Sequence, residues 1–222
     1  MVGSDWPQIA LWSAVVVSGL YHGVNPAMGW PLAVSNGLME RRTGALFKAL
    51  GCLSTGHILA ILVVIVPFAL LALLAEWQWT IRIGASALTI CFGALLLTRR
   101  RHPRLLARIP PSQLVLWSFV IAIAHGAALM LVPMYLGVCQ SFDVQRGHRA
   151  AAALMRANLG MAVVVSTVHA AAMLCAGGML AWLVYRHVGL KFVARSWFNL
   201  DMLWASSLIL VGILSLAINT MG

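Results

Sequence analysis

Long apolar segments are the feature of this sequence that most restricts its fold. A membrane-spanning α-helix needs about 20 apolar residues, and lipid offers no partners to exposed backbone groups. Six candidate segments follow one another, at about residues 7–39, 46–75, 81–98, 113–138, 159–185 and 202–221. They predict an all-α polytopic membrane protein with about six transmembrane helices, which form a single transmembrane domain over residues 1–222.

The composition agrees with a chain that lies in lipid. Hydrophobic residues make up 62% of the sequence and charged residues 9%, whereas about 25% of the residues of a soluble domain are charged. The formal net charge of +10 would suggest nucleic-acid binding in a soluble protein. In a membrane protein it is expected from cytoplasmic Lys and Arg and from anionic lipid headgroups. We therefore expect the lipid bilayer, and no nucleic acid, as a partner.

Basic residues predict the orientation of the chain. They gather in three segments between predicted spans, at 41–48, 99–108 and 186–195. Such segments face the cytoplasm, so both termini are expected outside it, in an integral protein of the bacterial cytoplasmic (inner) membrane. Segment 140–158 should then lie outside although it contains three arginines, and its part from 147 to 158 could lie along the membrane surface as a helix.

The first apolar segment contains polar and helix-breaking residues and is too long for one simple span. Pro26 lacks a backbone N–H and leaves a carbonyl without its helical partner. Irregular backbone inside a membrane occurs only where protein buries it or where it lines a water-filled cavity. We expect a first helix broken near Pro26, with His22 and Asn25 lining a cavity. The alternative is a proline kink that only shapes the bundle.

Four histidines lie within the apolar segments: His22, His57, His125 and His169. Ionisable side chains are costly in the membrane and usually face the bundle interior, and the neutral imidazole is the commonest metal ligand. We therefore predict that the four rings converge at one depth and line a site near the midplane. The alternative is that each ring bonds a backbone carbonyl or a hydroxyl and merely holds helices together.

Other polar residues accompany these histidines. Ser54 and Ser166 each precede one of them by three residues and could orient its ring. Met173 follows His169 by four residues and shares its helix face, although a methionine there also suits an apolar core. Asp201 stands at the start of the last apolar segment. It is expected either to cap that helix or to accept a proton or a cation.

The two halves of the chain, about 1–100 and 110–222, carry similar features. The triplet "YHG" at 21–23 matches "AHG" at 124–126, and the second and fifth apolar segments carry one histidine each. Three spans in each half would give the halves opposite orientations. This pattern predicts a 3+3 inverted repeat, which is typical of secondary transporters with a site near the midplane.

The run "HGVNPAMGWPLAVSNGL", followed by "TGHILAIL", resembles the nickel/cobalt exporter-type (NicO-like) membrane transporters of the LysE-type superfamily. That family has an early motif of the form His-Gly-x-Glu-Pro-Gly-His and a second histidine about one helix later. His22, Gly23 and Pro26 match the first motif, and His57 matches the second, within residues 19–63. The resemblance implies inverted three-helix halves and transport of a metal cation.

Two positions depart from the family motif. Asn25 stands at the acidic position, and Met28 stands at the position of the second motif histidine. A thioether is a softer ligand than an imidazole and favours Cu(I) over nickel or cobalt. The departures are equally compatible with a site that binds no metal and handles another small solute.

These features lead to a ranked set of functions. The first is an integral membrane secondary transporter for a metal cation or other small solute, in which a transition metal ion (Cu, Ni, Co or Zn) is the expected occupant. The expected metal ligands are His22, His57, His125, His169 and Met28. Asn25 and Asp201 are expected as further substrate-binding or ion-binding residues.

Two other functions stay open. A membrane-embedded metal-dependent or haem-dependent enzyme or redox protein is the alternative, because four histidines can hold a metal centre or two axial haem pairs. The third is a structural or accessory membrane subunit whose buried histidines only join helices. Another copy of the chain, in a homo-oligomer, is a further possible partner. No GxSxG, HExxH or GxxxxGK[ST] motif is present, so no catalytic residue is assigned.

Overall fold

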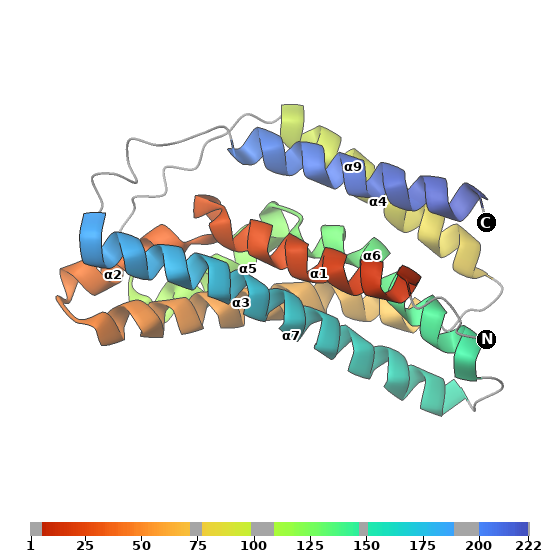
Figure 1. The fold of residues 1–222 in the computed structure, drawn as a ribbon, viewed down its shortest axis with the longest axis horizontal. Helices are drawn as coiled ribbons and strands as arrows, with labels where there is room; N and C mark the ends of the chain where they lie inside the picture. The colour runs from red at the N-terminus through yellow and green to blue at the C-terminus, as the bar shows by residue number, and fades with distance from the viewer. Residues whose placement is uncertain (1–5, 72–76, 99–108, 147–150, 189–199, 222) are drawn as a thin grey trace.

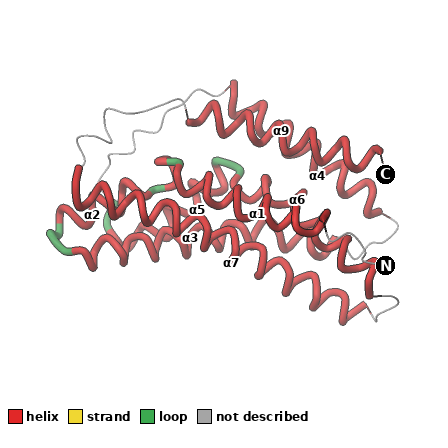
Figure 2. The backbone as a smooth tube through the Cα atoms, in the orientation of Figure 1, coloured by secondary structure: helices red, strands yellow, loops and turns green. Residues whose placement is uncertain are grey.

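The computed structural model describes residues 6–71, 77–98, 109–146, 151–188 and 200–221. Apart from short turns and loops, the chain is helical in these ranges and contains no strand there (Figure 2). This confirms the predicted all-α class. The helices are α1 (Trp6–Val24), η1 (Pro26–Met28), α2 (Trp30–Met39), α3 (Thr43–Leu71), α4 (Gln78–Thr98), η3 (Pro111–Gln113), α5 (Leu114–Ala124), α6 (Ala127–Arg146), α7 (Ala151–Leu183), the π-turn η4 (Val184–Val188) and α9 (Leu200–Met221).

Three of the described helices are long and apolar enough to cross a membrane: Thr43–Leu71, Trp79–Thr98 and Asn158–His187. The consecutive helices Pro111–Ala124 and Ala127–Cys139 pass the same test together and would make a fourth span. Two shorter apolar helices, Gln8–Val24 and Ala205–Thr220, cover the first and last predicted segments. The helices therefore coincide with all six apolar segments, and several of them are compatible with a membrane protein.

The first predicted break is confirmed. Asn25 takes an extended conformation, and its side chain caps the short helix η1 by accepting a hydrogen bond from the backbone N–H of Ala27. Pro26 occupies the first position of η1, where its missing N–H costs no helical bond. Gly29 ends η1 with a φ of 98°, a left-handed conformation that glycine adopts readily. Helix α2 starts at the next residue.

A second break separates α5 from α6 at His125 and Gly126. The two helices meet at an angle of 67°, and Gly126 has a φ of 68°. A Cβ at Gly126 would lie 2.5 Å from the ring of Phe92 on α4, so a larger residue would meet both backbone strain and a clash. Each half of the chain thus has one interrupted helix next to a histidine.

Helices α1, α3, α5, α6 and α7 form the central bundle, and α4 and α9 pair along one side of it (Figure 1). Glycines allow close contacts inside the bundle. A Cβ at Gly19 would lie 2.5 Å from the carbonyl oxygen of His169, and a Cβ at Gly23 would overlap that of Met173. Since the contacts advance in the same direction on both helices, α1 and α7 are parallel and almost touch backbone to backbone.

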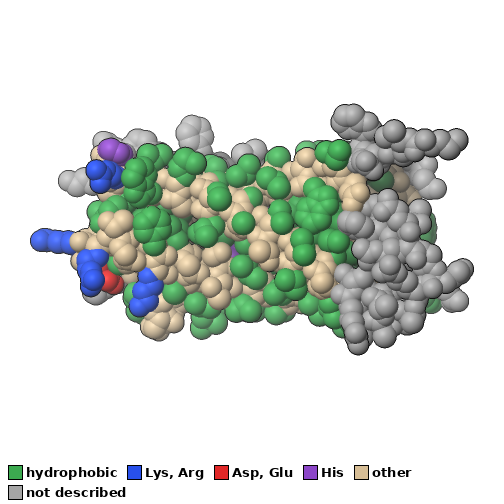
Figure 3. All heavy atoms as spheres, turned by 60° about the horizontal axis from the view of Figure 1, so that its bottom comes forward, with side chains coloured by type: hydrophobic (Ala, Val, Ile, Leu, Met, Phe, Trp, Pro, Cys, Tyr) green, Lys and Arg blue, Asp and Glu red, His purple; other side chains and the backbone are tan. Residues whose placement is uncertain are grey.

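Basic side chains gather at one end of the bundle (Figure 3). Arg41 and Arg42 form the turn between α2 and α3, Lys48 lies in the first part of α3, and Arg186 lies in η4, and all four are exposed. Arg82, which is half-buried near the start of α4, lies toward the other end. Helix α1 begins and α9 ends at that other end (Figure 1). Basic segments 99–108 and 189–195 lie outside the described residues.

The sides of the bundle are apolar. Large hydrophobic residues such as Val63, Leu116, Met179 and Ile218 are each more than half exposed. An apolar surface of this extent is normally covered by lipid or by another protein. Lipid suits this surface because the backbone N–H and C=O groups are already hydrogen-bonded within the helices.

Part of the segment from 147 to 158 belongs to a long helix. Residues 147–150 lie outside the described part, but residues 151–158 are the first turns of α7, which continues without a break to Leu183. The expected helix over 147–158 is therefore present from residue 151, as the start of α7, and its place along the membrane surface stays a prediction. Asn158 also contributes to the interior, because its backbone carbonyl accepts a hydrogen bond of 3.0 Å from the buried Tyr135 hydroxyl.

Candidate functional site

Three histidines from three different helices meet inside the bundle. His22 is in the last turn of α1, and His57 and His169 lie near the middle of α3 and α7. Their exposed fractions are 0%, 2% and 0%. The ring centroids are 5.3 Å apart for His22 and His57, 5.2 Å for His22 and His169, and 5.7 Å for His57 and His169. We call these three residues the histidine cluster.

The cluster forms because small residues bring its helices together. On α1, Gly19 and Gly23 flank His22 and pack against the α7 backbone around His169. On α3, Gly56 precedes His57, and a Cβ at Gly56 would overlap the carbonyl oxygen of Val115 on α5. Close backbone contact through small residues is the usual way in which helices associate in a membrane. The same contacts keep the imidazoles away from the bundle surface.

A hydrogen-bond chain sets the tautomer of His169. The Ser18 hydroxyl donates to the carbonyl oxygen of Val15 at 2.8 Å and lies 3.0 Å from Nδ1 of His169. A hydroxyl has one proton, and a carbonyl can only accept, so Ser18 accepts the second bond from His169 Nδ1–H. In the neutral ring, Nε2 of His169 is then unprotonated and carries a lone pair. This nitrogen is the acceptor or metal-binding atom of the ring.

Several polar atoms at the site have no hydrogen-bond partner among the described residues. They are Nε2 of His57, Nε2 of His169 and Nδ2 of Asn25, and all three are buried. A buried polar group without a partner costs free energy of about 1–3 kcal/mol, and most such groups in proteins are satisfied by something. The site therefore has capacity for a bound ion, solute or water.

The ring spacing suits a metal ion, but the rings do not already surround one position. Imidazole nitrogens about 2.1 Å from a tetrahedral metal put the ring centres about 5 Å apart, close to the distances seen here. The His57 and His169 rings are nearly parallel, with 13° between their planes. Among the described residues no three His, Cys, Asp or Glu side chains have their donor atoms arranged around a metal. Ring rotation is needed before three nitrogens can bind together.

Asn25 and Met28 lie beside the cluster, at the break after α1. Asn25 has an exposed fraction of 2%, and its Oδ1 is occupied by the bond from the Ala27 N–H. Its Nδ2 remains as a donor and its Oδ1 keeps a second lone pair, so this side chain can bind an acceptor, a water molecule or a cation. Met28 is also buried and lines a small cavity.

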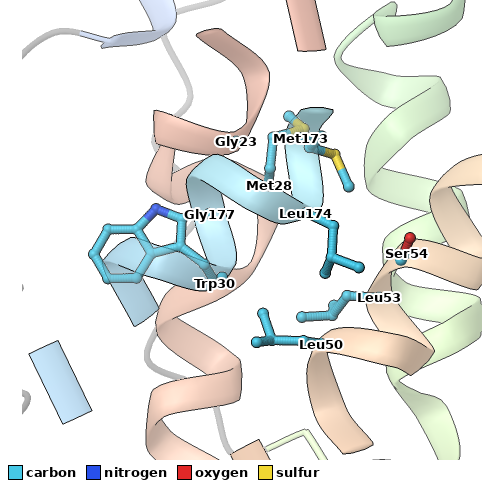
Figure 4. A pocket seen from close by; sticks show the side chains of 10 residues that line it. Gly23, Met28, Trp30, Leu50, Leu53, Ser54, Met173, Leu174 and Gly177 are labelled. Atoms are coloured by element: carbon cyan, nitrogen blue, oxygen red, sulfur yellow. The ribbon is translucent and has the colours of Figure 1, made fainter. Parts of the chain in front are cut away.

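This cavity has a volume of about 20 Å³, enough for about one water molecule. Met28, Met173 and Ser54 are among its lining residues (Figure 4). Ser54 therefore faces the cavity instead of orienting His57 as the sequence suggested. Ser166 also differs from that expectation, because its hydroxyl donates to the carbonyl oxygen of Ala162 on its own helix at 2.6 Å.

His125 differs from the three clustered histidines. It is half-buried at the break between α5 and α6, and its Nδ1 lies 3.1 Å from the carbonyl oxygen of Ile121 in the preceding turn. Of the four histidines predicted to converge, three are thus in direct ring contact, and the fourth lies at the second helix break.

Acidic groups contribute little to the described interior. Glu40, exposed at the turn after α2, is the one acidic residue whose side chain the structure describes. Asp201 is the second residue of α9, a position where a carboxylate stabilises a helix, but its side chain lies outside the described part. The proposed donors of the site, three imidazoles and nearby thioethers, are all neutral.

Sequence reasoning missed Ser18. Its signal is present in the spacing, because Ser18 and His22 are four residues apart and so lie on the same face of α1. The hydroxyl faces the cluster from there but bonds a histidine on α7, which no spacing within α1 can reveal.

Comparison of the chain with protein-family models, with curated proteins and with solved structures finds no match.

Proposed function

We propose that this chain is an integral membrane secondary transporter for a transition-metal cation or another small solute. The observation that carries the proposal is the contact among His22, His57 and His169, which come from three helices and are almost completely buried. Imidazoles at such depth usually mark an ion or proton pathway. Neutral rings with unprotonated nitrogens bind transition metals, and a metal cation is therefore the preferred solute.

The absence of a ready-made coordination sphere among the described residues suits transport better than permanent storage. A transported ion must bind well enough to enter and weakly enough to leave. Rings that have to rotate to bind a cation make the bound state less stable than a rigid three-histidine site would. The Ser18 bond limits this freedom at His169 and presents its Nε2 lone pair for binding.

We extend the proposal to a 3+3 inverted repeat in a six-span bundle. Its main support is the pairing of α4 with α9. A Cβ at Gly93 would lie 2.9 Å from the carbonyl oxygen of Ala205, and a Cβ at Gly212 would lie 3.0 Å from that of Ser86. Gly93 and Gly212 are 119 positions apart, as are Ser86 and Ala205. The two helices therefore make the same contact in exchanged roles, as a twofold axis between two halves requires.

The histidines and the helix breaks also occupy corresponding places in the two halves, with a different offset in the sequence. The pairs His57 and His169 and Ser54 and Ser166 are each 112 positions apart, at corresponding places in α3 and α7. Each half also interrupts its first helix beside a histidine. In transporters built from such halves, the halves move relative to each other around a central site. We propose that the histidine cluster is that central site.

The alternative of a haem protein has less support. Two axial imidazoles must face each other across the whole macrocycle, whereas the three clustered rings are in direct mutual contact. Optical spectra of the purified protein test this alternative directly. A Soret band that disappears in His22→Ala would replace the transporter proposal with a haem or redox function.

The transport proposal is tested with purified protein in liposomes that contain a metal-sensitive dye. Uptake of Ag⁺, Zn²⁺, Ni²⁺ and Co²⁺ is measured for the wild type and for His57→Gln. At least one cation should enter wild-type liposomes faster than empty ones. His57→Gln should reduce its uptake by at least about tenfold, since even loss of an outer-shell partner has an effect of this size.

His187→Gln is the matched control, because His187 is exposed at the basic end of the bundle, in η4 after α7. It should transport like the wild type. Size-exclusion profiles establish that each variant is folded and monodisperse before uptake is compared. Equal uptake by His57→Gln and the wild type, or no uptake of any cation by the wild type, would refute metal transport through the cluster.

A further inference from the structure

Two methionines meet beside the histidine cluster. Met28 comes from η1 and Met173 from α7, and each has an exposed fraction of 7%. Both line the cavity of about 20 Å³ (Figure 4). Thioether sulfur is a soft, uncharged ligand that binds Cu(I)-type cations and binds hard or borderline divalent ions poorly. We call Met28 and Met173 the methionine pair.

The cavity lies next to the cluster on its basic side. Gly23 follows His22 on α1 and Met173 follows His169 by one turn on α7, and both helices run toward the basic end. Ser54 precedes His57 by one turn on α3, which starts at the basic end. All three helices therefore place the cavity between the basic end and the imidazoles. A cation in the cavity would be one step from the cluster.

The charge of a cation affects how much free energy it costs to move that cation along such a path. Imidazole and thioether groups are uncharged, so the histidine cluster and the methionine pair would bind a cation without adding negative charge. The cost of removing an ion from water rises with the square of its charge, and it is already several kcal/mol for a single charge in real proteins. Removing a divalent cation from water would therefore cost about four times as much free energy as removing a monovalent cation of similar size.

We propose that the substrate is a soft monovalent cation of the Cu(I) and Ag(I) class, and that it passes between the methionine pair and the histidine cluster. This inference rests on the proposed transport function and specifies its substrate. Cu(I) and Ag(I) accept two or three ligands, so two thioethers or two rings suffice at each step. The cavity, which holds about one water molecule, admits a dehydrated ion of this kind.

The test uses the liposome assay with Ag⁺, which needs no reductant, and with Zn²⁺, Ni²⁺ and Co²⁺. We expect uptake of Ag⁺ at least about tenfold faster than that of any divalent cation, the margin that soft-ligand selection and charge should produce together. If a divalent cation enters through the histidine cluster and Ag⁺ does not, the inference is overturned and the transporter proposal stands. If no cation enters, the inference fails together with metal transport through the cluster.

Substitution of the methionine pair tests its role separately. Met28→Leu and Met173→Leu keep nearly the same volume and hydrophobicity but remove the sulfur. Met179→Leu is the matched control, because Met179 also lies on α7 but is 63% exposed on the bundle surface. The double variant Met28→Leu/Met173→Leu should lower Ag⁺ uptake by about tenfold or more, the usual effect of altered metal ligation. Met179→Leu should change nothing.

X-ray absorption of Ag⁺ bound to the purified protein supplies a readout that does not depend on transport. With one equivalent of Ag⁺ and with the four free cysteines replaced, the protein with both methionines and its Met179→Leu variant should show silver–sulfur scattering, which the double variant should lose while silver–nitrogen scattering remains. Unchanged silver–sulfur scattering in the double variant, or unchanged Ag⁺ uptake, would rule out the methionine pair as a step on the path.

Discussion

At the scale of single residues, Ser18 constrains one ring of the histidine cluster, that of His169, although it is neither charged nor among the expected metal ligands. Its one proton goes to Val15, so it must accept a bond from His169 Nδ1–H, which leaves His169 Nε2 unprotonated. Partners of this kind fix ring tautomer and orientation in metal sites. The same relation explains why a buried hydroxyl on α1 matters to a histidine on α7.

Ser18→Ala should release this constraint. NMR of protein labelled with ¹⁵N in its histidines should show His169 as the Nδ1–H tautomer in the wild type and as a mixture in the variant. Ag⁺ affinity should fall by about 10–100-fold. Ser166→Ala is the control, because that hydroxyl bonds its own helix and not the ring. An unchanged His169 tautomer in Ser18→Ala would show that Ser18 does not orient the ring.

At the scale of helices, close backbone contact through glycine decides which side chains meet. Gly19 and Gly23 bring α1 against α7, and Gly56 brings α3 against α5. Without a strong hydrophobic force between helices in lipid, such packing supplies much of the stability of the bundle. The same glycines flank the clustered histidines in sequence. Their small size therefore serves both packing and the position of the imidazoles.

Gly56→Ala should destabilise the bundle, because the added methyl group would overlap the carbonyl oxygen of Val115 and force α3 and α5 apart. The expected loss is about 1–3 kcal/mol. Thermal unfolding in detergent, followed by tryptophan fluorescence, measures it. Gly51→Ala on the same helix is the control. A Cβ at Gly51 would meet nothing within 4 Å, so this change should be neutral or should stabilise the helix by up to about 1 kcal/mol.

At the scale of the whole molecule, the described residues form an apolar body with exposed basic side chains gathered at one end. The Arg41–Arg42 turn, Lys48 and Arg186 lie together, while α1 begins and α9 ends at the opposite end. Basic loops remain in the cytoplasm during membrane insertion. The orientation expected from the sequence, in which both termini lie outside the cytoplasm, stays a prediction.

This orientation can be measured with single cysteines in a background where the four native cysteines are replaced. Thr43→Cys, beside the basic turn, should react with a membrane-impermeant maleimide only after the bacterial cells are permeabilised. Thr220→Cys, near the end of α9, should react in intact cells. The reverse labelling pattern would invert the topology. Labelling of both positions from the same side would contradict the arrangement of the helix ends.

What the sequence by itself determined is local. Apolar length specified the helices, Asn25, Pro26 and Gly29 specified the first break, and membrane depth singled out the histidines. These features depend on a residue and its near neighbours along one helix, which is why a linear pattern contains them. Only the tertiary structure decided which groups meet. Contact between helices depends on how surfaces distant in sequence interlock, and here the glycines set that register.

Three outcomes follow from this register. The rings of His22, His57 and His169 are in contact, whereas His125 lies at the second helix break. Ser18, and not Ser166, bonds His169. Met28 shares a cavity with Met173. The spacing of Met173 from His169 was visible in the sequence, but its meeting with Met28 was not, because η1 and α7 are joined only by the folding of the bundle. Helical periodicity predicts on which face of its helix a side chain lies. Which residues of other helices contact that face depends on the packing of the bundle.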